Sequence, residues 1–515
     1  MGLPVAVAGI GVAGTAAALA LLARGARVTV LDERDPGLQR CEQLRRAGAH
    51  VSVGPGRAVL PAGTQLVVTS PGWHPDSPLL RAAARGGVPV WGEIELAWRL
   101  GADRAGGRLP WLALTGTNGK TTAVGMLAAI LSAAGLRAAA VGNVGVPAVT
   151  AVGDPDLDVL AVELSSFQLR GVSTLAARAA AVLNLAADHL DWHGGMAGYA
   201  TAKARIYDRV SGVTVTNADD PATARMLAAA APGPGARAVS FTLGCPGSDQ
   251  LGVRDGALVD CAFSGDPVTG AGSGDPVTGA GSGDPVTGAG SGITLAAFAD
   301  LAHLAGGVPA PHLIADALAA AALARAHGVP AAAVAAGLRT YRGAGHRIAQ
   351  VATVAGVRYV DDSKATNPHA AAASLAAFDR VVWIAGGLAK GASFDELVIG
   401  ARTRLRAAVL LGTDRGLIAD ALARHAPQVP VRMVADPDTG PVGLDSSAGG
   451  AGTDPPVTAD GAADLMARAV SVAAGLAHPG DVVLLAPACA SMDNFRDYAD
   501  RGERFATAVA GLGAG

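Results

Sequence analysis

Short apolar runs alternate with longer helical stretches along most of the chain. The run at residues 5–9 leads into a glycine-containing turn, a helical stretch that ends at Gly25, and a second apolar run at 27–32. A β-branched run follows at 65–70. Apolar strands that alternate with helices are typical of a doubly wound parallel sheet, so this pattern predicts an α/β fold.

The same pattern begins again twice. A second unit starts with the apolar run at 111–116 and continues with strands near 159–164 and 179–185. A third unit begins near residue 343 and contains the strand-like segments VRYVDD, RVVWIAGG, AAVLLG and DVVLLAP. At roughly 150 residues per domain, a chain of 515 residues fits three domains. We predict an N-terminal Rossmann-like domain (1–107), a central domain with a P-loop ATPase-like parallel sheet (108–342) and a C-terminal Rossmann-like domain (343–515).

A low-complexity tract separates the second and third units. The segment SGDPVTGAG occurs three times in tandem, at 264–272, 273–281 and 282–290. A calcium-binding β-helix would need a GGxGxDxUx pattern, and each copy here has one valine as its large apolar residue. We therefore predict a flexible surface loop at 264–291 and a second flexible insertion at 438–461.

Composition narrows the classes of function. Hydrophobic residues make up 50% of the chain and charged residues 16%, which excludes a wholly disordered protein. The net charge of −3 gives no footprint for nucleic acid or an anionic membrane, and no apolar stretch reaches the ~18 residues of a membrane span. The N-terminus lacks the basic region of a signal peptide, and the four scattered cysteines form no CxxC pair. We expect a cytoplasmic monomer that acts on small molecules.

Glycine is about twice as frequent as average, and some glycines lie in ligand-binding patterns. Gly9, Gly11 and Gly14 form a GxGxxG turn between a strand and a helix, and Asp32 ends the next strand. Such a turn places a pyrophosphate at a helix N-terminus, and the acid can accept a hydrogen bond from a sugar hydroxyl. Alone, this motif predicts a nicotinamide-dependent dehydrogenase, and its structural alternative is a tight turn without a ligand.

A second phosphate-binding pattern follows the apolar run at 111–114. Its residues are Gly116, Thr117, Asn118, Gly119, Lys120, Thr121 and Thr122. Backbone amides of such a loop cradle phosphates, Lys120 reaches the terminal phosphates, and the Thr121 hydroxyl can bind Mg²⁺. Leu114 stands where the generic GxxxxGK[ST] pattern has its first glycine. Two such turns favour ATP chemistry on a substrate that itself carries a nucleotide.

Three further polar residues lie downstream of the second unit's strands. Glu163 and His189 are expected at the ends of apolar strands, where ligands bind in open α/β sheets and where both could hold a phosphate-bridging metal. Individually, each is as well explained as a capping or loop residue. Lys203 lies on a predicted helix, and local sequence favours a solvated lysine there.

The third unit carries a polar cluster behind its strands. Arg347 precedes a strand that ends in Asp361, and Asp362 and Lys364 follow that strand. Lys390 lies in IAGGLAKGASF and Ser491 in PACASMDNF. An arginine can clamp a phosphate or carboxylate in bidentate fashion, so this cluster is suited to holding anions.

Together these motifs resemble the Mur ligases, the ATP-dependent amide ligases that build the peptide stem of peptidoglycan. The resemblance covers nearly the whole chain and follows the family's order. Its segments are GIGVAG, SPG at 70–72, TGTNGKTT, GNVG at 142–145, ELSSFQL, DHLD at 188–191, AKARIY, GHR, DDSKATN, GGLAKG and PACASMDNF. The last five favour the branch that adds D-glutamate to UDP-N-acetylmuramoyl-L-alanine, and the DNPR motif of the diaminopimelate- or lysine-adding branch is absent.

The resemblance implies a mechanism through an acyl phosphate and a tetrahedral intermediate, with ATP as co-substrate and two Mg²⁺ ions. It implies that Thr121 and Glu163 hold one Mg²⁺, and that His189 and a carbamylated Lys203 hold the other. The catalytic set is then Lys120, Glu163, His189 and Lys203. The implied ATP contacts are the loop 116–122 with Arg347, Asp362 and Lys364. The implied contacts of the UDP-substrate are Gly11, Val12, Ala13, Gly14, Asp32, Glu33, Ser70, Pro71, Gly72, Asn143, Ser165 and Gln168, and those of D-glutamate are Thr366, Lys390, Ser491 and Tyr498.

The sequence departs from the family pattern near residue 312. His312 is followed by Leu313 and Asp316 where the family often shows HNxxN, which leaves the adenine contact open. Other readings are a different Mur-type ligase, a folylpolyglutamate-type ligase, a dehydrogenase or a non-catalytic nucleotide-binding module. A folylpolyglutamate-type ligase should lack the N-terminal GxGxxG domain, and the last two leave TGTNGKTT or the set of Lys120, Glu163 and His189 unexplained.

Overall fold

The computed structural model describes most of the chain as two compact units. The described residues are 2–33, 38–263, 292–304, 309–343, 345–434 and 459–512. The predicted loop at 264–291 lies outside them, as does the predicted insertion at 438–461 except for its last three residues, which begin helix α16 (Ala459–Leu476). One unit comprises 1–185 and 194–342, and the other comprises 186–193 and 343–515.

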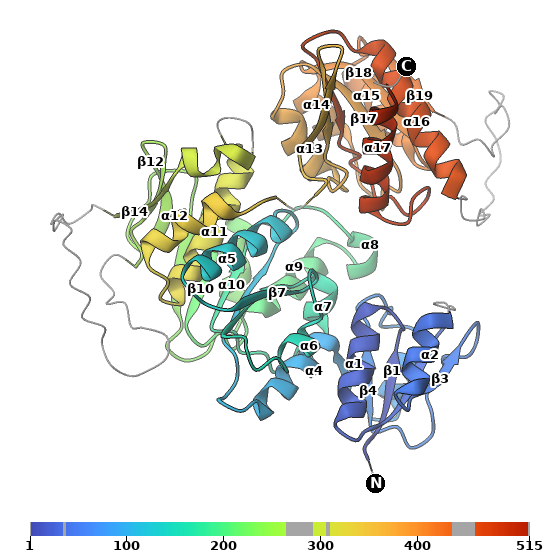
Figure 1. Cartoon of the computed structure of the whole chain (residues 1–515), viewed down its shortest axis with the longest axis vertical. Helices are drawn as coiled ribbons and strands as arrows, with labels where there is room; N and C mark the ends of the chain where they lie inside the picture. The colour runs from blue at the N-terminus through green and yellow to red at the C-terminus, as the bar shows by residue number, and fades with distance from the viewer. Residues whose placement is uncertain are drawn as a thin grey trace. The chain divides into compact units, whose positions relative to one another are not determined.

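The first unit begins with a five-stranded parallel sheet in the order β3-β2-β1-β4-β5 (blue in Figure 1). Its strands are β1 (Pro4–Ala8), β2 (Arg27–Asp32), β3 (His50–Val53), β4 (Leu66–Thr69) and β5 (Val90–Gly92). Its helices are α1 (Val12–Ala23), α2 (Leu38–Arg46), α3 (Pro78–Arg85) and α4 (Glu93–Leu100), followed by the 3₁₀ turn η1 (Gly101–Asp103).

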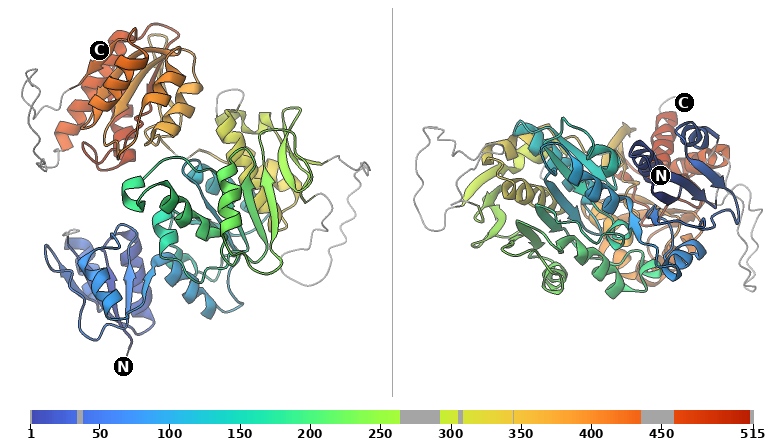
Figure 2. Two further views of the ribbon diagram at one scale, coloured as in Figure 1. Left: turned by 180° about the vertical axis from the view of Figure 1, so that it is seen from behind. Right: turned by 90° about the horizontal axis from the view of Figure 1, so that it is seen from below.

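A nine-stranded sheet forms the rest of the first unit, in the order β14-β13-β12-β11-β10-β9-β6-β8-β7. Its strands are β6 (Trp111–Thr115), β7 (Ala138–Gly142), β8 (Val159–Glu163), β9 (Ala179–Val182), β10 (Val213–Asn217), β11 (Arg237–Phe241), β12 (Gln250–Arg254), β13 (Ala257–Asp260) and β14 (Ile293–Ala297). Its helices are α5 (Lys120–Ala133), α6 (Ala148–Ala151), α7 (Ser166–Arg170), α9 (Met196–Ala204), η2 (Arg205–Tyr207), α10 (Pro221–Ala229), η3 (Phe298–Leu304), α11 (Pro311–Ala326) and α12 (Ala331–Thr340). Helices α5, α11 and α12 cover one face with a continuous apolar core, and Figures 1 and 2 show this sheet from its two sides.

The second unit holds a six-stranded sheet in the order β15-β16-β20-β17-β18-β19. Its strands are β15 (Ala349–Val354), β16 (Val357–Asp361), β17 (Val381–Gly386), β18 (Leu405–Leu411), β19 (Val431–Met433) and β20 (Val482–Leu485). Its helices are α8 (Leu190–His193), α13 (Pro368–Ala376), α14 (Asp395–Ala401), α15 (Arg415–His425), α16 and α17 (Tyr498–Leu512). Helices α13, α14 and α15 pack on one apolar face of the sheet, and α16 and α17 pack on the other.

The predicted α/β fold with three sheets is confirmed, and two details differ from the prediction. The central sheet is parallel except at one edge, where β13 pairs antiparallel with β12 and β14. In the third sheet, the strand that ends at Asp361 is preceded by an antiparallel partner, β15, which begins just after Arg347. The buried parallel strands read as continuous apolar runs, whereas the edge strands β14 and β15 are only partly buried and give a weaker pattern.

Helix α4 joins the two sheets of the first unit through two buried carboxylates. The Glu93 carboxylate accepts a hydrogen bond from the Val149 amide at 2.7 Å, and burial raises its pKa to about 7. Burial also acts to raise the pKa of Glu95, but the hydroxyl of Thr174, the amides of Ser173 and Thr174 and the Arg99 guanidinium outweigh it and lower that pKa to about 2. The pKa values of the two acids on this helix are therefore shifted in opposite directions, and their contributions to stability change with pH in opposite ways.

We expect Glu93→Gln to stabilise the protein at pH 8 and to have little effect near pH 5. A folded-state pKa above the ordinary value means that Glu93 contributes stability at low pH and loses it as pH rises through about 7. The shift corresponds to about 3 kcal/mol at most. Glu95→Gln is the matched control and should destabilise at pH 8, because its carboxylate is held ionised. Thermal unfolding at both pH values measures this, and a loss of stability in both variants at pH 8 would contradict the assignment.

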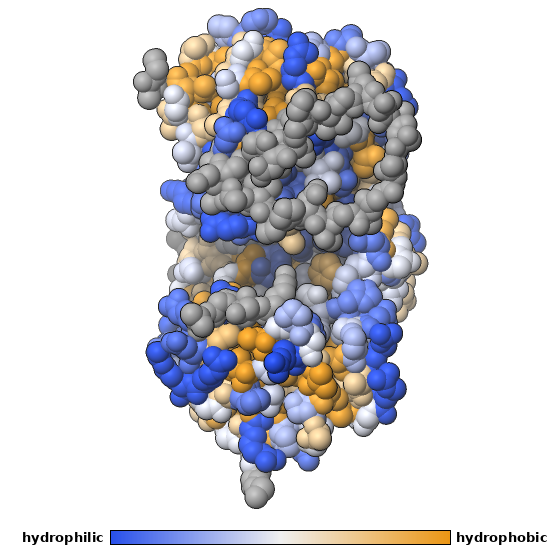
Figure 3. Space-filling model, turned by 90° about the vertical axis from the view of Figure 1, so that its right-hand side faces the viewer, coloured by the Kyte–Doolittle hydropathy of each residue, from blue (hydrophilic) through white to orange (hydrophobic). Residues whose placement is uncertain are grey.

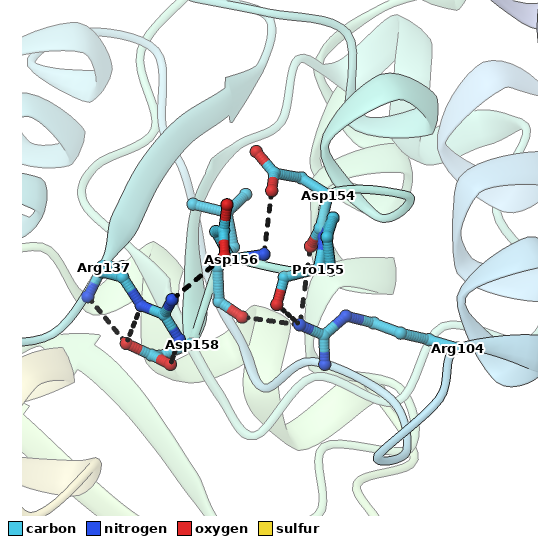
Figure 4. A network of polar contacts seen from close by, with 7 residues as sticks. Arg104, Arg137, Asp154, Pro155, Asp156 and Asp158 are labelled. Carbon is cyan, nitrogen blue, oxygen red and sulfur yellow. Dashed lines mark hydrogen bonds and ion pairs between the residues drawn. The ribbon is translucent and has the colours of Figure 1, made fainter.

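Two arginines fix the loop that leads into β8. Arg137 forms ion pairs with Asp158 at 2.8 Å and Asp156 at 3.3 Å (Figure 4). Arg104, on the connection between the two sheets, donates to the carbonyls of Pro155 at 3.0 Å and Leu157 at 2.8 Å. This network anchors the start of the strand whose last residue is Glu163.

Hydrophobic and hydrophilic side chains are interspersed on the face shown in Figure 3. Among the described residues, no helix combines the length and the apolar character that a membrane crossing requires.

Candidate active site

The predicted phosphate loop lies between the buried strand β6 and helix α5. Gly119 precedes the helix with a φ of 82°, in the left-handed region. A Cβ at this position would lie 2.1 Å from Oδ1 of Asp316 on α11. A Cβ at Gly116 would lie 2.9 Å from the side chain of Leu183. Backbone conformation and close protein packing therefore require these glycines.

Two lysines converge on one carbonyl of this loop. Lys120 Nζ donates to the carbonyl oxygens of Gly116 at 2.9 Å and Thr117 at 2.8 Å. Lys203 Nζ donates to the same Gly116 oxygen at 2.6 Å and lies 4.6 Å from the ring centroid of Tyr199. The local expectation of a solvated Lys203 was wrong, because this side chain is only 1% exposed. Helix α9 carries it into the interior beside the phosphate loop.

Asn184 was missed in the sequence, although it contacts the loop more extensively than any predicted residue outside it. It lies just beyond β9, and its side-chain oxygen accepts from the amides of Thr117 at 3.1 Å and Asn118 at 2.9 Å. Its side-chain nitrogen donates to the Asn118 carbonyl at 3.2 Å. The polar residue after the apolar run AAAVL was the available signal. Asn184 therefore determines the path of the first half of the loop.

We expect Asn184→Ala to lower kcat/KM for ATP by roughly 30- to 100-fold. Two to three hydrogen bonds at about 1 kcal/mol each hold the loop, and without them its bound conformation must be ordered by ATP itself. The matched control is Asn217→Ala, since Asn217 ends the neighbouring strand and donates to Leu183 rather than to the loop. Steady-state kinetics with both variants test this. Equal losses in the two variants would assign the effect to general destabilisation.

Among the predicted site residues, Glu163 is the carboxylate whose surroundings best suit a metal ligand. It is the last residue of β8 and is 1% exposed. Its Oε1 accepts from Asn143 Nδ2 at 2.9 Å, whereas its Oε2 is buried and has no hydrogen-bond partner in the described part of the chain. A buried carboxylate oxygen without a hydrogen-bond partner is suited to binding a cation. The Glu163 side chain therefore fits a divalent cation such as Mg²⁺.

The sequence suggested that His189 ends a strand, but in the structure it does not. It lies seven residues beyond β9, immediately before α8, with a φ of 53°. Its segment, 186–193, belongs to the second unit. Across the described ranges, no group of three or more His, Cys, Asp or Glu side chains forms a metal site by itself.

The N-terminal glycine turn is a tightly packed strand–turn–helix. Asp32 Oδ2 accepts from the Ile10 amide at 2.8 Å, so this acid supports the turn. A Cβ at Gly14 would lie 1.9 Å from the Gly9 carbonyl oxygen, which makes glycine obligatory there. Gly11 is exposed and has open space around its Cβ position. The structure thus places the backbone of Gly11 where a ligand can approach it.

The remaining predicted substrate residues of the first unit lie at the starts of helices and in loops after strands. Val12 and Ala13 begin α1, Ser70, Pro71 and Gly72 follow β4, and Glu33 accepts from the Gly56 amide at 2.7 Å. Ser165 and Gln168 form a capping box at α7, in which the Gln168 oxygen accepts from the Ser165 amide at 2.9 Å. These two residues therefore have a structural role of their own.

In the second unit, the predicted polar residues gather behind the parallel strands. Asp362 follows β16 and receives a short hydrogen bond from Ser374. Burial raises the pKa of Asp362 to about 6, although the Ser374 hydroxyl and the Arg347 guanidinium act in the opposite direction. Lys364 Nζ lies 3.5 Å from the ring centroid of Tyr498.

Backbone hydrogen bonds join the three loops that carry the predicted D-glutamate contacts. Leu388 and Ala490 exchange two hydrogen bonds of 2.9 Å, which brings the loop of Lys390 beside that of Ser491. The Ala488 amide donates to the Ala365 carbonyl at 2.9 Å, next to Thr366. Lys390 is exposed with a φ of 51°, whereas Ser491 is buried.

Arg501 and Gly502 on α17 hold these loops together and were also missed. Arg501 is completely buried and donates to the Ser363 hydroxyl at 2.9 Å, the Ser363 carbonyl at 2.9 Å and the Cys489 carbonyl at 3.2 Å. A Cβ at Gly502 would lie 2.1 Å from Nδ1 of His346, whose imidazole pairs with Asp361 at 2.6 Å. Only a glycine leaves room for that pair.

A phosphate loop that joins a buried strand to a helix, with two lysines and a buried carboxylate around it, is typical of α/β enzymes that use nucleoside triphosphates. The comparisons with known proteins specify the class further. Residues 4–92 match the MurD-like N-terminal domain of Mur ligases, 114–249 the Mur ligase middle domain, and 346–489 the Mur ligase glutamate ligase domain. The chain belongs to the Mur ligase family.

Relatives align along nearly the full length. The UDP-N-acetylmuramoylalanine–D-glutamate ligase of Streptomyces avermitilis is 54% identical over 514 residues, which cover 99% of this chain and 98% of that protein. The protein of the same name from Mycolicibacterium smegmatis is 46% identical and covers 99% of this chain and 96% of its own.

Solved structures agree in fold. The UDP-N-acetylmuramate–alanine ligase MurC from Thermotoga maritima superposes with a TM-score of 0.56 at 17% identity and covers 99% of both chains. MurF from Acinetobacter baumannii gives a TM-score of 0.55 at 18% identity and covers 96% of this chain and 92% of its own. At such identities the likeness concerns the fold alone.

Proposed function

We propose that this ATP-dependent amide ligase attaches D-glutamate to the alanyl carboxylate of UDP-N-acetylmuramoyl-L-alanine. The observation that carries the proposal is the extent of the similarity. Relatives named for this reaction align with 99% of the chain, and the N-terminal match is to the MurD-like domain rather than to another Mur type. A dehydrogenase, the prediction from the GxGxxG turn alone, gives no role to the phosphate loop beside Glu163.

The proposed chemistry has two steps. A carboxylate is a poor electrophile, so the terminal phosphoryl group of ATP is first transferred to its oxygen, with release of ADP. The amine of D-glutamate then attacks the carbonyl carbon of the acyl phosphate. The tetrahedral intermediate collapses to the amide and expels phosphate. Lys120 at the phosphate loop stabilises the charge on the transferring phosphoryl group.

The roles of the other residues follow the same proposal. Thr121 and Glu163 bind one Mg²⁺, and His189 with a carbamylated Lys203 binds a second. Mg²⁺, when bound, neutralises charge on the phosphates. The three functional regions are 1–107 for the UDP-substrate, 108–342 for ATP and 343–515 for D-glutamate. Arg347, Asp362 and Lys364 contact ATP, while Thr366, Lys390, Ser491 and Tyr498 bind D-glutamate. The nucleotide end of the substrate lies against Asp32 and the Gly11 turn.

Phosphate release tests the proposal directly. Purified protein is incubated with ATP, Mg²⁺ and UDP-N-acetylmuramoyl-L-alanine, with and without D-glutamate, and the product is identified by mass spectrometry. We expect turnover that depends on D-glutamate. Turnover with L-glutamate, L-lysine or diaminopimelate in its place would assign a different acceptor. Oxidation of a reduced nicotinamide without phosphate release would support the dehydrogenase alternative instead.

A further inference from the structure

Two of the four cysteines flank strand β12 near one edge of the central sheet. Cys245 is exposed and Cys261 is half-buried, whereas Cys41 and Cys489 are buried. Strand β12 lies between the segment that carries Cys245 and the segment that carries Cys261. The Val253 amide donates to the Gly244 carbonyl at 2.8 Å on one side, and the Cys261 amide donates to the Gln250 carbonyl at 2.9 Å on the other.

A glycine allows the first cysteine to cross this strand. A Cβ at Gly252 would lie 2.5 Å from the Gly244 carbonyl oxygen and 2.9 Å from the Pro246 nitrogen. The segment Gly244–Pro246 therefore passes over the face of β12 on which Gly252 has no side chain. Cys245, at the centre of this segment, lies above that face.

The second cysteine faces the same way. Gln250, Gly252 and Arg254 share one face of β12, because side chains alternate along a strand. Leu251 pairs with Asp260, so Gln250 and Cys261 lie opposite each other at the next position of the two chains. The side chains of that pair project to the face of β12 that carries Arg254. A Cβ at Gly292 would lie 2.5 Å from the Cys261 sulfur, so a second glycine leaves space for this thiol.

One guanidinium shares this face of β12 with the two cysteines. Interactions with Cys245, and to a smaller extent with Cys261, raise the pKa of Arg254. A positive charge beside a thiol favours the nucleophilic thiolate form. The site therefore combines an exposed thiol, a second thiol on the same face of the sheet, and a cation beside them.

We propose that Cys245 and Cys261 form a peroxide-reactive dithiol site. The Cys245 thiolate attacks one oxygen of hydrogen peroxide, the O–O bond breaks, and a sulfenic acid and hydroxide form; the hydroxide takes up the thiol proton as water. The Cys261 sulfur then attacks the sulfenic sulfur, expels its hydroxyl as a second water, and completes an intramolecular disulfide. Both thiols are oxidised by one electron each, and one peroxide is reduced to two waters.

Peptide mapping of the reduced full-length protein tests this site. The protein is treated with one equivalent of hydrogen peroxide, blocked with N-ethylmaleimide and digested without reductant. We expect a linked peptide pair that contains Cys245 and Cys261 and is two hydrogen atoms lighter than the separate peptides. Cys41 and Cys489 should stay reduced and react only after unfolding. Intermolecular disulfides, or uniform oxidation of all four cysteines, would overturn the proposal.

Variants separate the two steps. In Cys261→Ser, the sulfenic acid of Cys245 should accumulate and be trapped by a cyclic dione, whereas Cys245→Ser should yield little sulfenic acid and no link. Arg254→Met should slow oxidation several-fold. Arg225→Met is the matched control, since it removes an exposed arginine on α10 and should oxidise at the wild-type rate. Equal rates in Arg254→Met and the wild type would also overturn the proposal.

Discussion

Replacing Lys120 with methionine should lower kcat/KM for ATP by about 10³-fold, or about 4 kcal/mol of transition-state stabilisation. Methionine keeps most of the unbranched side chain but removes the ammonium that the Gly116 and Thr117 carbonyls hold in the phosphate loop. The charge that develops on the transferring phosphoryl group then has no cation at this position. Thermal unfolding should change little, because Lys120 is only half-buried at the start of α5.

Lys120→Arg is the control that distinguishes charge from shape. An arginine keeps the positive charge but presents a wide planar fork in place of a compact ammonium, so we expect no rescue. Of the 40 lysine and arginine residues in the chain, four are lysine: Lys120, Lys203, Lys364 and Lys390. All four are candidate site residues. This indicates that the chain uses arginine where a positive charge alone is enough, and lysine at the predicted site. Recovery of most of the activity in Lys120→Arg would contradict a requirement for lysine.

Local sequence patterns were enough to predict the fold and the strand–turn–helix of the predicted phosphate loop. Apolar runs gave strands β6, β8 and β9 because buried parallel strands are apolar on both faces. A glycine-containing turn between a strand and a helix gave the loop at 116–122, because phosphate binding uses backbone groups that are contiguous in sequence. In these cases the interactions that determine the structure lie within a few residues of each other.

The residues that were missed act across long separations in sequence. Asn184 contacts Asn118 from 66 residues away, and Arg501 contacts Ser363 from 138 residues away. For Lys203, the local sequence alone favoured a solvated side chain because nothing near it reveals that α9 packs against the phosphate loop; only the family resemblance included it in the catalytic set. The scarcity of lysine was the overlooked signal, since in an arginine-rich chain each remaining lysine is conspicuous.

Replacing Glu163 with glutamine should lower kcat by at least about 10²-fold and raise the Mg²⁺ concentration needed for half-maximal activity. Glutamine preserves the volume and the acceptor for Asn143 Nδ2, but it removes the charge from the buried Oε2. Without Mg²⁺, the variant should be as stable as the wild type or more so, because it no longer buries a carboxylate oxygen without a partner. Activity and metal-free stability therefore change independently, or in opposite directions.

Glu93→Gln makes the same chemical change in another buried carboxylate of the first unit and serves as the matched control. Glu93 is 3% exposed and accepts its hydrogen bond from the Val149 amide, which ties it to the packing of α4 and not to the phosphate loop. Its variant should keep the wild-type kcat and Mg²⁺ requirement. Titration of activity with Mg²⁺, together with thermal unfolding in the presence of a chelator, measures both variants. If Glu163→Gln kept the wild-type Mg²⁺ requirement, or lost stability in the chelator, the carboxylate would be a structural group, because a metal ligand contributes its binding energy only when the ion is present.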